Sequence, residues 1–324
     1  MQMIFLAFGL ACTNLNAMEL KDRIIAGSGN ESIQRHVFEK VDTFILDGKQ
    51  CCRSKAGSNC IRLHIAHITD DQQEHCTITT DDNIFSHFIF NARENIASLS
   101  LYAPDQRIQP SQEIHVSLAL KKYATIAMHG YIETSFAQSI QSDVLKIKAT
   151  SGAIVHMSGV DAHKIVMEAT DDSAIKMLEN EQLKTDVIAL VCKDDASITA
   201  HIQAKVLQVE KDGTGTIKLS GSVDEQKLYL KNGSYLAHNL VSPIIRPIIR
   251  KGYGTIEMTG LEWIEGCING ETAHNVVYKT YEHILWMAPE EDILNDFLNK
   301  YPKTKEFSKE DILKYIIWKQ DQKS

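Results

Sequence analysis

The sequence predicts an all-β protein: a right-handed, parallel β-solenoid preceded by an irregular β region and followed by a short pair of α-helices. Three observations support this fold class. The chain repeats about every twenty residues, each repeat opens on turn-forming residues, and each contains two short strands. A repeat of this length implies stacked units, because one unit alone cannot bury its apolar face.

The repeat occupies residues 122–270, and its central units share one apolar anchor each. These anchors are spaced by 20, 23, 19, 19 and 20 residues: Val155, Ile175, Ile198, Ile217, Leu236 and Ile256. A long apolar side chain follows four of them two positions later, and Ala200 and His238 break that rule. Turn formers precede each anchor, because Gly permits positive φ and Asp or Asn bonds to its own backbone. These pairs are Ser151-Gly152, Asp171-Asp172, Asp194-Asp195, Gly213-Thr214, Asn232-Gly233 and Gly252-Tyr253.

A second strand with alternating polarity lies in each unit, at residues 145–148, 165–168, 187–190, 206–209 and 228–231. Two short strands and two turns leave no room for a helical crossover. They suit one coil of a solenoid, in which each strand pairs in parallel with the same strand of the next coil, about 4.8 Å away. A propeller is the alternative, but six units would make about three blades, below the usual four to eight.

The regions on either side of the repeat follow different patterns. Residues 18–35 are polar and are expected to be loose. Residues 36–121 form the irregular β region, with strands expected at 41–46, 61–65, 84–90, 96–102 and 114–120. Two prolines in residues 243–250 exclude a central ladder strand there, and packing under the C-terminal helices is expected instead. Residues 282–324 form a helical cap, with helices at 289–299 and from the capping box at Ser308 to Trp318.

The first 17 residues are uncharged and include an apolar run of ten residues, which predicts a secretory signal cleaved after Ala17. Lipidation at Cys12 and a buried first strand are the alternatives. The run is too short to span a membrane. The 324 residues carry a net charge of −8 without a Lys/Arg cluster, which argues against nucleic acid as a partner.

Seven cysteines are present, and signal cleavage would leave an even six. Four of them lie close together: Cys51, Cys52, Cys60 and Cys76. In an exported protein this cluster predicts one or two disulfides whose connectivity the sequence leaves open. A zinc site with His64, His67 or His75 is the alternative, although no C-x-x-C pair occurs.

The candidate site for a ligand or cation is a group of four aspartates in matching turns: Asp171, Asp172, Asp194 and Asp195. Stacking would bring their carboxylates together, where a calcium ion could offset their repulsion. Ordinary turn chemistry is the alternative reading. Asp172 and Asp195 could also serve a glycosidase, but no aromatic platform or catalytic motif accompanies them. The repeat histidines His129, His156, His201 and His238 are expected at solvated positions.

The residues from 38 to about 260 resemble the head GIN domain of putative auto-transporter adhesins. The resemblance rests on the strand that begins at Phe38 and ends at Gly48, and on small-residue turns followed by an Ile-x-Leu pattern at 151–153, 213–221 and 252–260. The strand at 114–118 and residues 121–126 fit the family's entry into its coils. Asp171-Asp172 and Asp194-Asp195 depart from the family's Gly-rich turns. The resemblance implies an exported, right-handed β-helix-like domain with an adhesive role.

Together these observations predict an exported, non-enzymatic binding or adhesion protein of the bacterial envelope or cell surface. A glycan or a surface protein is the expected partner, and no cofactor is expected beyond the possible calcium. The first alternative is a polysaccharide lyase or glycosidase built on the solenoid. The second is a structural scaffold of the envelope.

Overall fold

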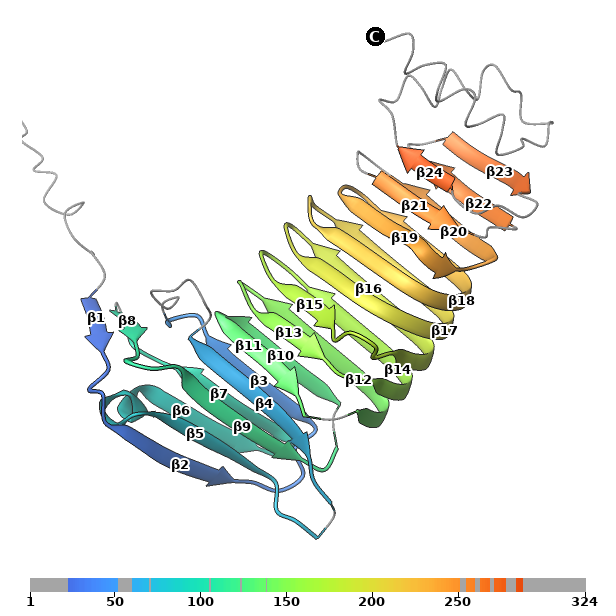
Figure 1. The fold of residues 1–324 in the computed structure, drawn as a ribbon. Helices are drawn as coiled ribbons and strands as arrows, with labels where there is room; N and C mark the ends of the chain where they lie inside the picture. The colour runs from blue at the N-terminus through green and yellow to red at the C-terminus, as the bar shows by residue number, and fades with distance from the viewer. Residues whose placement is uncertain are drawn as a thin grey trace, which may run out of the picture.

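The protein is an elongated stack of β-coils in the computed structural model (Figure 1). The structure describes residues 23–51, 60–69, 71–104, 106–122, 124–137, 139–250, 255–259, 263–268, 271–277 and 284–287. Within them lie 24 strands and one short 3-10 helix, η1 (Asp82–His87). The predicted all-β class and the stacking of coils are therefore confirmed. The signal segment 1–17 and the expected helices at 289–299 and 308–318 lie outside the described residues.

Each regular coil contributes three strand segments, which we call first, middle and last. In one coil the first segment is β15 (Ala174–Met177), and β16 (Leu183–Lys193) supplies the middle segment 183–185 and the last segment 187–193. In the next coil a single strand, β17 (Ser197–Asp212), supplies all three. Every segment pairs in parallel with its counterpart one coil away, as predicted.

The remaining coils repeat this pattern along the stack. The first segments before β15 are β11 (Ile132–Phe136) and β13 (Ile154–Met157). Their last segments lie in the strands that follow them, β12 (Ile140–Thr150) and β14 (Val160–Ala169), and the last segment β10 (Thr125–Gly130) precedes β11. After β17 come β18 (Thr216–Leu230), β19 (Ser234–Val241), β20 (Ile244–Arg250), β21 (Thr255–Thr259) and β22 (Trp263–Ile268).

The predicted anchors form one inward column, with a single error of register. Val155, Ile175, Ile198 and Ile217 pair in order and are fully buried. The next coil places Tyr235, not Leu236, opposite Ile217. Tyr235 fits inside because its hydroxyl donates a 2.5 Å hydrogen bond to Oε1 of the buried Gln226. The same shift makes Ala237 the next buried position, a small residue as at Ala200 of the same column.

The N-terminal β region joins the same stack, but its coils are out of sequence order. Strand β3 (Thr43–Gly48) lies between β7 (Ile96–Leu101) and β10, and β4 (Ile61–His67) lies between β9 (Ile114–Leu120) and β11. Along the sequence, β3 and β4 thus belong to the second coil of the stack, β7 and β9 to the terminal coil, and β10 and β11 to the third coil. Buried Glu74 secures both crossings, since its carboxylate accepts the main-chain N–H groups of Val41 at 3.0 Å and Lys121 at 2.9 Å.

Antiparallel strands cover the N-terminal end of the stack. Strand β5 (His75–Asp81) pairs with β9, β6 (Phe88–Arg93) pairs with β7, and β2 (Glu31–Val37) pairs with β5. A small parallel sheet joins β1 (Arg23–Ala26) to β8 (Gln106–Gln109). The expectation of a loose segment is therefore wrong for residues 23–35. Ile84, expected in a strand, lies in η1, whereas the strand β5 was missed because it lies among cysteine and turn residues.

The C-terminal part of the stack also corrects two expectations. Residues 244–250 form the central strand β20, between β18 and β22, despite the prolines. The pairing with β22 skips from Ile245 to Ile248, and this bulge takes Pro247 out of the ladder. Strand β24 (Ile284–Met287) lies within the region predicted to be a helical cap and pairs antiparallel with β21. Strand β23 (Glu271–Val277) pairs antiparallel with β22.

Candidate binding groove

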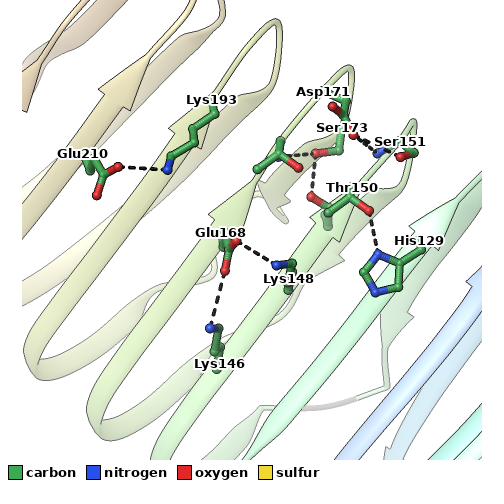
Figure 2. A network of polar contacts seen from close by, with 12 residues as sticks. His129, Lys146, Lys148, Thr150, Ser151, Glu168, Asp171, Ser173, Lys193 and Glu210 are labelled. Carbon is green, nitrogen blue, oxygen red and sulfur yellow. Dashed lines mark hydrogen bonds and ion pairs between the residues drawn. The ribbon is translucent and has the colours of Figure 1, made fainter.

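The four aspartates singled out from the sequence lie in stacked turns, and Figure 2 shows the contact of Asp171 with Ser151 of the neighbouring coil. Oδ2 of Asp171 accepts hydrogen bonds from the N–H and hydroxyl of Ser151, at 3.2 and 3.0 Å. Oδ2 of Asp194 accepts the N–H of Asp171 at 3.4 Å, and Asp195 accepts the hydroxyl of Thr214. Asp171 and Asp194 also hold positive φ angles of 61° and 55°. The structure thus gives these residues a role in closing the turns, and calcium binding stays a prediction.

The cysteine cluster forms one disulfide among the described residues, between Cys51 and Cys60. Cys76, the third candidate, is buried as a free thiol, and burial raises its pKa to about 12. Cys52 lies outside the described residues. The described residues contain no group of three or more His, Cys, Asp or Glu side chains that could hold a metal ion, so the zinc alternative receives no support.

A groove runs along the stack where the middle and last segments of five successive coils meet. Its lining comes from residues 141–144, 161–163, 184–186 and 203–205, with Ser222 and Asp224 at one end and Asp42, Lys122 and Ala124 at the other. None of these residues was among the sites predicted from the sequence. The groove is therefore a site that the structure adds.

The lining residues form three rows that follow the stacking register. The outer row contains Gln141, Asp161, Lys184, Gln203 and Ser222, each directly opposite the next. The floor contains the small residues Ser142, Ala162, Thr185 and Ala204. The corner row contains the residues that the ladder skips between the middle and last segments: Asp143, His163, Asp186, Lys205 and Asp224.

Hydroxyl groups on the floor help to bend the coil at the corner. The Ser142 hydroxyl donates to the main-chain carbonyl of Val144 at 3.1 Å, and the Thr185 hydroxyl lies 3.0 Å from that of Val187. The Ser242 hydroxyl likewise donates to the main-chain carbonyl of Ile244, two residues later, at 3.4 Å. Such local bonds favour turns over continuous strand. They explain why small hydroxyl residues recur at this position.

Charge in the groove is mixed, and its centre is an ion pair between two coils. Oδ1 of Asp186 lies 2.8 Å from Nζ of Lys205, and Oδ2 lies 3.1 Å from Nδ1 of His163. The Lys205 hydrogen bond, followed by that of His163, lowers the pKa of Asp186, and Asp186 in turn raises the pKa of Lys205. Both groups therefore stay charged near neutral pH, exposed to any ligand in the groove.

The sequence contains a signal for this groove in the spacing of its small residues. The floor positions Ser142, Ala162, Thr185 and Ala204 are small residues spaced by 20, 23 and 19 residues, the same spacing as the anchors. The middle segments went unrecognised because most of them continue into the neighbouring strand without a turn.

The fold and the groove define an elongated β-solenoid with a polar binding surface. Residues 177–270 match the model of the family described as putative auto-transporter adhesin, head GIN domain. The resemblance predicted from the sequence is therefore confirmed over this segment. A search of curated proteins finds no match.

Solved structures of three bacterial proteins share the fold. A putative adhesin from Bacteroides fragilis is 13% identical with a TM-score of 0.58, over 72% of this chain and 98% of its own. A putative adhesin from Parabacteroides merdae is 17% identical with a TM-score of 0.51, over 71% and 82%. A putative adhesin from Parabacteroides distasonis is 15% identical with a TM-score of 0.51, over 75% and 100%. At these identities the likeness concerns the fold alone.

Proposed function

We propose that this protein is an exported, non-enzymatic binding protein of the bacterial envelope or cell surface, and that its groove holds a linear glycan. The observation that carries the proposal is the groove itself, in which polar side chains of five coils line up in register. The adhesin family match and the Cys51–Cys60 disulfide support a location outside the cytoplasm. Among the described residues, no helix is long and apolar enough to cross a membrane. The coil is expected to be right-handed, as parallel β-crossovers nearly always are.

The shape of the groove fits a chain molecule rather than a compact one. Five coils at about 4.8 Å each place Gln141 and Ser222 about 19 Å apart along the axis. The first four of these coils offer the same three kinds of position: an outer polar residue, a small floor residue and a corner residue. A polymer with a regular repeat can make similar contacts at each coil.

The available hydrogen-bonding groups favour a hydroxyl-rich partner over a peptide strand. A peptide that adds to a sheet needs free main-chain groups at an edge. The middle segments 160–162, 183–185 and 202–204 pair with the coils on either side, and segment 140–142 pairs with 160–162. A ligand must therefore bind through side chains, and the amides, carboxylates and ammonium groups present here suit sugar hydroxyls.

The charge state of the central carboxylate favours binding over hydrolysis. A glycosidase needs one carboxylic acid that holds its proton until the leaving group takes it, which requires a raised pKa. The pKa of Asp186 is lowered instead, because Lys205 and His163 bond to its charged form. Asp186 is therefore suited to accepting hydrogen bonds and unsuited to donating a proton.

A glycan array probed with the full chain, followed by product analysis of every bound glycan, tests this proposal. We expect retention of linear glycans and no release of shortened or unsaturated sugars. Release of such products would overturn the proposal in favour of the enzyme. Failure to retain any glycan on the array would overturn it as well.

A further inference from the structure

A second outward row, on the first segments of the coils, carries no acidic side chain at the seven positions before Leu236. The stacking register places seven residues in one line: Ser117, His64, Ser135, His156, Lys176, Thr199 and Lys218. All of them are exposed except His156, which is half-buried. We call these seven residues the basic row. Two are lysines and two are histidines, on a chain whose net charge is −8.

Two acidic groups beside the basic row are already engaged. Glu113 accepts a 2.5 Å hydrogen bond from Nε of Arg62. Oε1 of Glu133 lies 3.4 Å from Nε2 of His156, and its other oxygen lies 4.0 Å from Arg62. Arg62 and Glu133 lie in the neighbouring outward row with His115. Both glutamates are half-buried, whereas Arg62, His115, Lys176 and Lys218 are exposed.

This surface differs from the groove in the sign of its charge. The groove contains five aspartates against three lysines and one histidine, so a polyanion would meet repulsion there. The basic row offers only neutral and basic groups, at intervals of about 4.8 Å over about 29 Å. A linear polymer with regularly spaced negative groups complements such a row.

We infer that the basic row binds a linear polyanion, a chain that carries carboxylate, sulfate or phosphate groups. The site lies on different segments of the coils from the groove and does not depend on the glycan proposed there. Its attraction to the polyanion is electrostatic and exposed to solvent, so added salt weakens it.

The binding of the full chain to four soluble polymers at low salt tests the inference. Polygalacturonate, dextran sulfate and polyphosphate present the three anionic groups, and neutral dextran is the control polymer. We expect binding to at least one polyanion and loss of binding in high salt. Comparison of the three polyanions shows whether carboxylate, sulfate or phosphate groups bind most tightly. Absence of binding to all three, or equal binding to neutral dextran, would overturn the inference, as would binding confined to anionic lipid vesicles.

A matched pair of variants locates the site. Lys176→Glu with Lys218→Glu reverses two charges of the basic row, two coils apart. Lys193→Glu with Lys231→Glu makes the same charge change on the last segments of the same coils. We expect the first variant to weaken polyanion binding by about tenfold or more and the second by less than about threefold. Equal weakening of polyanion binding in both variants would show that only net charge matters and would contradict a binding site at the basic row. Glycan retention by the groove should survive in both variants, which separates this inference from the proposed function.

Discussion

The inward and outward positions of the same coils follow different rules. Inward columns keep one character from coil to coil, as in the buried run Leu145, Ile165, Ile188 and Leu207. Outward rows change from coil to coil, as in the corner row from Asp143 to Asp224. Each inward residue packs on its counterparts above and below, so a change in one disturbs its neighbours. We therefore expect stability to depend on the inward columns and binding to depend on the outward rows.

Polar residues do enter the interior, and two of these cases inside the coils have partners that satisfy them. Lys211 occupies the inward column between Cys192 and Leu230, and its ammonium donates to the Gly213 carbonyl at 2.8 Å. Tyr235 and Gln226 bond to each other. A buried polar group without a partner costs about 1–3 kcal/mol, and among the described residues only the Thr80 hydroxyl is a buried side-chain group of this kind.

The largest expected effect comes from a cavity in an inward column. Ile188→Ala should lower the free energy of unfolding by about 2–5 kcal/mol, because Ile188 is fully buried. Urea unfolding measures the loss. Lys184→Ala, four residues earlier on the same strand but exposed, should change stability by about 0.5 kcal/mol or less. Similar losses in both variants would break the distinction between columns and rows.

The polar exception inside the stack gives an intermediate effect. Tyr235→Phe removes the hydroxyl that satisfies Gln226 and should cost about 1–3 kcal/mol. Adding Gln226→Leu should restore part of that loss, because the double variant leaves no buried polar group unpaired. A double-mutant cycle by urea unfolding measures the coupling. Additive losses would show that the two side chains act independently.

The acidic turns should give the smallest effect on stability. Asp171→Asn with Asp194→Asn keeps an acceptor oxygen at each turn, and Asn tolerates positive φ. We expect a change of less than about 1 kcal/mol in the free energy of unfolding. A calcium titration of the melting temperature accompanies this variant. A calcium-dependent rise in the wild type that the variant loses would instead support the predicted calcium site.

The sequence predicted the regular coils because each inward position recurs at a nearly fixed spacing. It placed the inward residue of one coil at Leu236 rather than Tyr235, because a tyrosine looks like a surface residue until its partner Gln226 is known. It could not predict the first coils. Strand β3 pairs with β7, whose partner residues lie 53 positions later, and no period connects them.

The groove was missed for a different reason. Its residues belong to different coils, and only the stacking register brings Asp186 and Lys205 together. The predicted aspartate site was found from its turn residues, yet the structure uses those carboxylates to join turns. A pattern in one repeat therefore identifies turns and columns, whereas a binding row appears only after the repeats are aligned.

The affinity of a groove variant for a glycan retained on the array tests the central claim most directly. Asp186→Ala with Lys205→Ala removes the ion pair in the groove. The control variant, Lys193→Ala with Glu210→Ala, removes an ion pair whose charged atoms lie 3.0 Å apart and which joins the last segments of the same two coils (Figure 2). Calorimetric titration should show at least about tenfold weaker binding for the first variant and less than about twofold for the second. Equal affinity of both variants, with melting temperatures unchanged, would contradict the claim that the groove holds the ligand.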